Sequence, residues 1–260
     1  MAENRVPEIE EIPQKDVGTT WARPVDKLKV SAAGTGINLN VDGRQLSSPL
    51  RGFGQMWQKT YRIRLEGADV KPRDLIKAWK ENFPRFWPEG NRFYGRAGGM
   101  QPGDVALLNL AGPGGIQGPH GLPVISTGVM VIYADEESFS FMTPEGHMFA
   151  GMITFSAFEE DGTVAQVQTL IRANDPIYEI SFRLGFGNKS EDAFWRQTLE
   201  NLAAFFGASG EVTQENVLVD SRMQWSHARN VWQNAFIRTG IYLALSPLRW
   251  LKGVLRREGA

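Results

Sequence analysis

The architecture of this chain follows from one stretch, Leu122–Ala173, which reads LPVISTGVMVIYADEESFSFMTPEGHMFAGMITFSAFEEDGTVAQVQTLIRA. Apolar and polar residues alternate along most of it with a period of two, the pattern of strands that bury one face. Polar turns around Glu136, Glu145 and Asp161 separate the alternating runs. Runs joined by such short turns are typical of antiparallel neighbours. The stretch therefore predicts a curved antiparallel sheet built as a meander.

Strand and helix patterns precede this sheet. Gln55–Glu66 alternates as a strand with one buried and one solvated face, and Val105–Leu110 predicts a further strand. Between them, Val70–Phe83 has a proline in its first turn and repeats apolar residues at helical spacing. Pro84 and Pro88 then enclose a short second segment. We therefore expect a strand, a helix with a short helical companion, and a second strand ahead of the meander.

A long amphipathic helix is predicted after the meander. Its apolar stripe runs in steps of four, three and four from Trp195 to Phe206. Ser190 is expected to be its N-cap, and Gly207 is expected to end it. The segment Ile177–Phe186 fits two alternatives, an extension of this helix toward the N-terminus or a separate turn. Helices outside an antiparallel sheet predict an α+β fold.

Length and composition set broad limits on function. The chain has 260 residues, of which 42% are hydrophobic, enough for a sizeable core. It has no cysteine and three scattered histidines, so neither a metal nor a cofactor is expected. A net charge of −1 gives no chain-wide attraction to nucleic acid. Because we find no signal peptide and no membrane-spanning run, we expect a cytoplasmic protein.

The sequence divides into three regions. Residues 1–50 are predicted to be an N-terminal arm, in which Ile37–Val41 alternates ahead of Asp42-Gly43 and indicates a hairpin. Residues 51–207 hold the sheet and the long helix. Residues 208–260 are predicted to be a basic, amphipathic helical tail.

The tail combines positive charge with apolar faces. Residues 222–260 contain seven Arg or Lys residues and one Glu, a net charge of +6. Two helices are expected, one from Trp225 to Thr239 and one after Ser246-Pro247. Tryptophan and arginine on such helices fit a membrane surface or a partner protein, which would make the protein membrane-peripheral. The alternatives are that the tail packs on the outer face of the protein's own sheet or pairs across a homodimer.

The order of elements over Gln55–Gly207 resembles the helix-grip superfamily of START-like or SRPBCC domains. This superfamily includes birch-pollen-allergen-like proteins, lipid-transfer START domains and polyketide cyclases or aromatases. A nearer likeness, over Gly103–Ala173, is to uncharacterised bacterial domains with a Thr-x-Pro-Gly-His-like turn, to which Thr143-Pro144-Glu145-Gly146-His147 is similar. The acidic pair expected a few residues later is replaced by Met152-Ile153. The resemblance implies a curved sheet that grips the long helix and leaves an apolar cavity between them.

The implied cavity would be lined by apolar residues of a gate formed by the short helices, of the strands and of the long helix. The predicted lining residues are Trp79, Phe83, Phe86, Trp87, Phe141, Phe149, Ile153, Phe155, Trp195, Leu199 and Leu202. The alternative for each is plain core packing, because aromatic residues at these spacings also fill cores. Together they predict a site for a hydrophobic small molecule or a lipid.

The sequence favours ligand binding without catalysis. The sequence has two acid–base candidates, His147 and Tyr178, and His147 lies in a predicted turn beside Glu145. One alternative is an enzyme of the cyclase, aromatase or dehydratase type, in which His147 or Tyr178 moves protons. A second alternative is a peripheral membrane or partner-binding protein that acts through its C-terminal helices. The binding hypothesis requires a hollow between the sheet and the long helix, and the enzyme hypothesis requires His147 to face that hollow.

Overall fold

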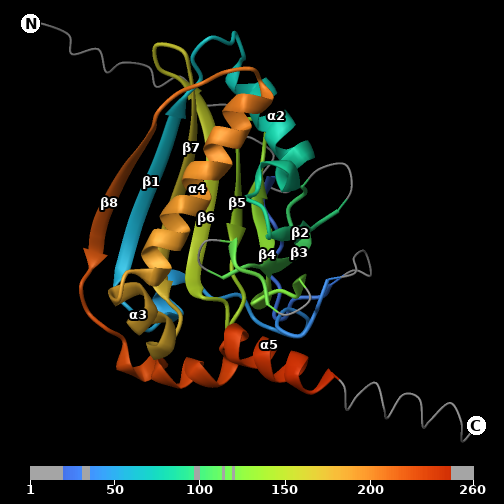
Figure 1. The fold of residues 1–260 in the computed structure, drawn as a ribbon, viewed down its shortest axis with the longest axis vertical. Coiled ribbons are helices and arrows are strands. Elements are labelled where there is room, and N and C mark those ends of the chain that lie inside the picture. Colours follow the sequence, from blue (N-terminus) through green and yellow to red (C-terminus); the bar gives the residue numbers. More distant parts are fainter. Residues whose placement is uncertain (1–19, 31–35, 97–99, 113–114, 119–120, 247–260) are drawn as a thin grey trace, which may run out of the picture.

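The computed structural model describes residues 20–30, 36–96, 100–112, 115–118 and 121–246 (Figure 1). Within these residues, eight strands form one antiparallel sheet in the order β2-β3-β4-β5-β6-β7-β1-β8. The strands are β1 (Met56–Arg64), β2 (Arg92–Tyr94), β3 (Val105–Leu110), β4 (Ile125–Ala134), β5 (Ser138–Met142), β6 (Phe149–Glu159), β7 (Thr163–Ala173) and β8 (Val212–Asp220). The predicted meander corresponds to β4 through β7, in which each strand pairs with the next one along the chain.

One long helix lies against the inner face of this sheet, and shorter helices lie at its two ends (Figure 1). The helices are η1 (Pro49–Arg51), α2 (Pro72–Asn82), η2 (Phe83–Phe86), α3 (Pro176–Arg183), α4 (Phe186–Phe205), η5 (Trp225–Gln233) and α5 (Ala235–Ala244). The long helix is α4. In Figure 1, α2 is near one end of the sheet, and α3 and α5 are near the other. The predicted α+β helix-grip class is therefore confirmed.

The main core lies where α2 and α4 meet the inner face of the sheet. Phe155, Val167 and Tyr61 lie in register on three neighbouring strands, and all three are fully buried. Leu199 and Leu202 of α4 belong to the same buried cluster. Full burial of a leucine, valine or phenylalanine side chain stabilises a fold by about 1.5–3 kcal/mol. The inward-facing residues of the strands and the apolar residues of α4 therefore pack into one core.

The outer face of the sheet is covered near β3 and β4 by the N-terminal segment. Leu28 and Val41 pack on Leu107 and Met130, which point away from the main core. Gly128 of β4 makes this close approach possible, because a Cβ atom there would lie 2.7 Å from Val41 Cγ2. The outward-facing Met130 of β4 is therefore covered by Leu28 and Val41 of the N-terminal segment.

The hairpin predicted at Ile37–Val41 and Asp42-Gly43 was wrong. The chain makes a turn there without pairing as two strands. Val41, which alternation assigned to a strand, is instead fully buried against the outer face of the sheet. A short alternating run followed by Asp-Gly is thus equally compatible with a turn whose single apolar residue is anchored on a neighbouring sheet.

The prediction of a helical tail from residue 208 was wrong for Val212–Asp220, which is the edge strand β8. It pairs with β1 along its whole length and so satisfies the second edge of that strand. Apolar and polar residues do not alternate clearly along β8, because most of its side chains are exposed, including Val217 at 44% and Leu218 at 42%. The predicted helix from Trp225 to Thr239 is present as two pieces, η5 and α5. The second tail helix, expected after Ser246-Pro247, lies outside the described residues, as do residues 1–19 and 31–35 of the N-terminal arm.

The start of the long helix also differs from the prediction. Ser190 is not its N-cap, because α4 begins at Phe186 and the Ser190 hydroxyl donates to the Phe186 carbonyl oxygen at 2.8 Å. The segment that fitted two alternatives forms a separate helix, α3, joined to α4 through Gly185 at φ +83°. A left-handed backbone conformation at this joint suits glycine. Among the described helices, none is long and apolar enough to cross a membrane.

Candidate functional site

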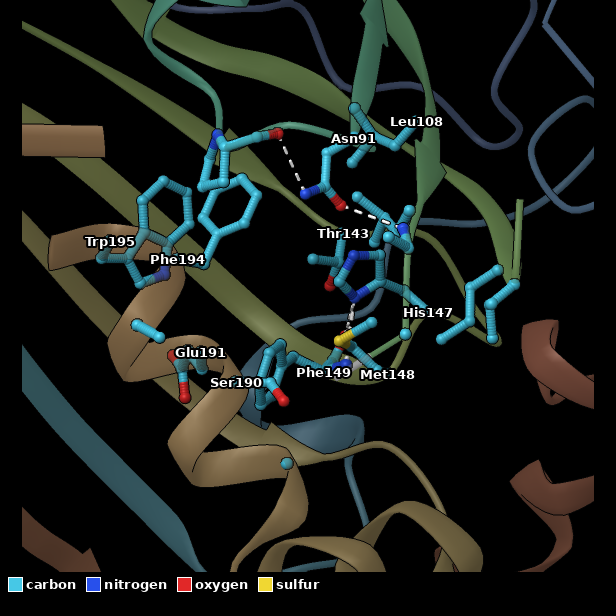
Figure 2. Close-up of a pocket in the computed structure, with 18 of the residues that line it drawn as sticks. Asn91, Leu108, Thr143, His147, Met148, Phe149, Ser190, Glu191, Phe194 and Trp195 are labelled. Atoms are coloured by element: carbon cyan, nitrogen blue, oxygen red, sulfur yellow. Dashed lines mark hydrogen bonds between the residues drawn. The ribbon is translucent and has the colours of Figure 1, made fainter. Parts of the chain in front are cut away.

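A cavity of about 860 Å³ lies between α4 and the inner face of the sheet (Figure 2). Its walls come from β3, β4, β6 and β7, from the first half of α4 and from α3. Lining residues that are exposed mark its mouth, with Phe186 and Phe236 on one side and Glu89 and Gln117 on the other. The mouth therefore opens between the α3–α4 joint, α5 and two loops.

The predicted lining residues divide into two groups. Six of them line the cavity, namely Phe83, Trp87, Phe141, Phe149, Ile153 and Trp195. The other five pack in the core beside it, namely Trp79, Phe86, Phe155, Leu199 and Leu202. Trp79 shows the reason, since it is fully buried and its ring centroid lies 5.3 Å from that of Phe155. The space between the sheet and α4 is thus filled with side chains near α2, and it is hollow near α3.

Several lining residues were missed from the sequence. Phe182 and Phe186 belong to the segment whose structure was left open, and they line the cavity together with Phe194. Phe182 stacks on the predicted residue Phe149, with ring centroids 4.8 Å apart. Phe194 was missed because the stripe assigned to α4 was centred on its neighbour Trp195. Two phenylalanines on either side of Gly185, just before the long helix, were the signal that could have located this wall.

His147 forms part of the cavity wall and is 6% exposed. Its turn is held in place from the tail side, because the Ala235 N–H donates to the Gly146 carbonyl oxygen at 2.8 Å. Gly146 has a φ of +85°, and a Cβ atom there would lie 2.1 Å from the Gln233 carbonyl oxygen. Burial lowers the pKa of His147 to about 4, so the imidazole is neutral near pH 7. Glu145, the expected partner, forms an ion pair with Arg51 at 3.4 Å instead.

Tyr178 also lines the cavity, at the start of α3. Its hydroxyl oxygen accepts a hydrogen bond from the Phe236 N–H at 3.1 Å, which fastens α3 to α5. Burial raises the pKa of Tyr178 well above its usual value, so the phenol keeps its proton. The arrangement gives Tyr178 a structural role at the mouth of the cavity.

A buried ionic cluster that was not predicted lies between β1 and α4. The Lys59 ammonium group is 2.8 Å from a Glu191 carboxylate oxygen and 3.0 Å from one of Asp192. The Tyr61 hydroxyl donates a 2.7 Å hydrogen bond to the same Asp192 oxygen. Lys59 shares the inner face of β1 with Tyr61, so a lysine at an inward position of a strand was the available signal. The cluster fixes α4 on the sheet beside the cavity, which Glu191 also lines.

Comparison with solved structures finds similarity over more than half of the chain. KanY protein (ms6282) is 13% identical, with a TM-score of 0.42 over 59% of this chain and 99% of that protein. The di-domain aromatase/cyclase StfQ of the steffimycin biosynthetic pathway is 12% identical, with a TM-score of 0.42 over 59% of this chain and 51% of that one. The major latex-like protein 151 of Panax ginseng is 13% identical, with a TM-score of 0.40 over 59% of this chain and 99% of that protein.

The fold is α+β, with one antiparallel sheet that packs around a long helix. No protein-family model matches the sequence, and no curated protein matches it either. Among the residues that the structure describes, no group of His, Asp and Glu side chains could hold a metal ion.

Proposed function

We propose that the protein binds an apolar small molecule or lipid in this cavity and does not catalyse a reaction. The observation that carries the proposal is the cavity itself, whose volume of about 860 Å³ lies within the usual range for ligand sites. Its walls are mostly aromatic and aliphatic. Removal of apolar ligand surface from water contributes roughly 25 cal/mol per Å² buried, which supplies the driving force.

Binding without catalysis is favoured over the enzyme alternative by the state of the two acid–base candidates. Tyr178 is engaged with backbone and keeps its proton. His147 is held neutral by burial, and its Nδ1 is engaged with Phe149. Efficient acid–base catalysis near neutral pH needs a group whose pKa is near the working pH. Neither residue meets that requirement.

A cavity-filling variant tests the proposal. Ile153→Trp adds a large side chain to the cavity wall, and Ser156→Trp makes the same kind of change on the opposite face of β6. We expect a neutral fluorescent apolar probe to bind the wild type and Ser156→Trp alike and Ile153→Trp at least roughly tenfold more weakly. Native mass spectrometry of detergent-free protein should also show a bound molecule. A wild type that carries no molecule and binds no apolar probe would contradict the proposal.

We infer a second candidate function, docking on an anionic membrane, from the surface beside the mouth of the cavity. Trp232 is 83% exposed and Trp225 is 73% exposed. This end surface comprises the exposed residues Ile177, Ile180, Leu184, Phe186, Trp225, Trp232, Phe236, Ile241 and Leu245. They come from α3, the start of α4, η5 and α5, which lie at one end of the molecule (Figure 1). Large exposed apolar patches mark interaction sites.

The charges around the end surface favour a membrane over an apolar protein partner. Basic residues on the same elements are Arg183, Lys189, Arg229 and Arg238. Tryptophan is preferred at the membrane–water interface, and arginine and lysine are attracted by anionic lipid headgroups. A protein docked in this way would be cytoplasmic and membrane-peripheral, and its cavity mouth would face the lipid. That arrangement would let an apolar ligand enter without crossing water.

A further inference from the structure

The hydrogen bonding of His147 determines which of its ring nitrogens carries the proton. Nδ1 is 3.0 Å from the Phe149 backbone nitrogen and 3.2 Å from the Phe149 carbonyl oxygen. An unpaired buried N–H costs more than an under-satisfied carbonyl, so the Phe149 N–H takes Nδ1 as its acceptor. A neutral imidazole that accepts at Nδ1 carries its proton on Nε2. The wall of the cavity therefore presents an N–H donor at Nε2.

Within the described part of the chain, this donor has no acceptor. Both hydrogen bonds of the ring involve Nδ1, and Nε2 has no partner among the described residues. His147 as a whole is 6% exposed. Figure 2 shows the ring among the lining side chains, with the edge opposite Nδ1 turned away from Phe149. Nε2 reaches the open space of the cavity, where a ligand can contact it, so a ligand that supplies an acceptor there would bind more tightly.

The other polar groups near this ring are already paired. The Thr143 hydroxyl accepts from the Gly151 N–H at 3.1 Å. The Asn91 carboxamide accepts from the Ala111 N–H at 3.0 Å and donates to the Pro88 carbonyl oxygen at 3.2 Å. These hydrogen bonds hold the walls together, and none of them involves His147.

Two further lining groups lack partners, and both can donate. The Trp87 indole Nε1 and the Thr169 hydroxyl are buried without a hydrogen bond in the described part of the chain. An indole nitrogen can only donate, and a hydroxyl can donate or accept. The unsatisfied polar groups of this cavity are thus matched by ligand oxygen acceptors.

The cavity offers no positive charge to an anionic ligand. The described residues that line it include no lysine or arginine, and the lining charges, Glu89 and Glu191, are acidic. Arg172, a fully buried arginine of β7, donates to the Gly54 carbonyl oxygen at 2.6 Å and does not line the cavity. A carboxylate or phosphate would have to be desolvated without a compensating cation, which is costly.

We propose that the His147 Nε2–H is the donor of a polar subsite, and that the ligand is an uncharged, mostly apolar molecule that presents a carbonyl or similar acceptor oxygen to it. This inference rests on the proposed binding function and narrows the ligand class. It distinguishes neutral ketones, quinones and esters from free fatty acids and from pure hydrocarbons.

A matched pair of probes tests the inference on the full chain. The fluorophore prodan carries a ketone, and its analogue with a methylene in place of the carbonyl does not. We expect the wild type to prefer prodan by roughly five- to tenfold, the value of one neutral hydrogen bond. His147→Phe should abolish this preference and shift the emission of bound prodan to shorter wavelength, because the carbonyl loses its donor. His147→Gln, which keeps a side-chain N–H, should retain part of it, and His227→Phe, outside the cavity, should retain all of it.

The outcomes separate the two proposals. If the wild type binds neither probe, the binding function itself fails. If it binds both probes equally, or if His147→Phe keeps the preference, the polar subsite is wrong and the binding function stands. Nitrogen NMR of the wild-type histidines gives an independent check that needs no variant, because a proton on Nδ1 of His147 would overturn the assignment.

Discussion

The side-chain amide of Asn234 donates a 2.8 Å hydrogen bond to the carboxylate of Asp175, and each of these residues is also the N-cap of a helix. Asp175 accepts from the Ile177 N–H at the start of α3, and Asn234 accepts from the Ile237 N–H at the start of α5. Both caps are fully buried. The two helices that border the mouth of the cavity are therefore joined through their caps.

Asn234→Ala should destabilise the protein. It removes the cap of α5, which contributes about 1 kcal/mol, and leaves the buried Asp175 carboxylate short of a donor at a cost of about 1–3 kcal/mol. We expect chemical denaturation to give an unfolding free energy lower by roughly 2–4 kcal/mol. Asn216→Ala, at an exposed position of β8, should change it by less than about 0.5 kcal/mol. Equal stability of the two variants would contradict the role of the linked caps.

Lys59 and Glu191 should behave as a coupled pair. Lys59→Met leaves the Glu191 carboxylate buried without its partner, and such losses cost about 3–5 kcal/mol. The double variant Lys59→Met/Glu191→Leu removes both charges, so we expect it to recover most of that loss in urea unfolding. A double variant no more stable than Lys59→Met alone would show that the cluster is not held together by this pair.

The burial of His147 predicts a pH dependence of stability. Its pKa is lowered from 6.5 to about 4 by desolvation in the fold. Between these pH values the unfolded chain binds a proton that the folded chain does not. The unfolding free energy should therefore fall as the pH decreases from about 6.5 to 4, by up to about 3 kcal/mol. The difference between the wild type and His147→Gln isolates this contribution, because carboxylates titrate in both proteins, and parallel pH profiles would contradict it.

Membrane docking predicts a charge- and tryptophan-dependent association with vesicles. We expect the full chain to float with vesicles of phosphatidylserine and phosphatidylcholine, and less as ionic strength rises, because salt screens the arginines. Trp232→Glu and Ile180→Glu should each weaken flotation. Val217→Glu, an exposed apolar position on β8, is the matched control and should not. Equal flotation of all variants, or none with the wild type, would eliminate this candidate function.

The parts of the fold that the sequence predicted well are those in which one face is buried and the other is wet. One face of each strand from β4 to β7 packs on the core, so apolar residues recur at every second position of these strands. The edge strand β8 lacks this constraint, since both of its faces reach solvent, and its sequence pattern is correspondingly weak.

The candidate site was predictable only as a set of apolar positions. Trp79 and Trp87 have the same chemistry, yet one fills the core and the other borders the cavity. Trp79 lies on α2 and Trp87 directly follows η2, and tertiary packing decides which of these two positions borders the hollow. The tautomer of His147 likewise depends on the Phe149 N–H, a partner that the turn sequence does not reveal.

The close contact between Gly146 and Gln233 bears on how this protein can be dissected. The turn that carries His147 rests on the η5–α5 junction, so a shortened chain that stops at Asp220 would lose the support of its ligand-facing wall. A change in ligand or vesicle binding by such a truncated chain could therefore come from the damaged cavity wall or from the loss of η5 and α5. If the two proposed functions hold, a shift of α5 on a vesicle would move the turn that carries His147 and would change the ligand affinity.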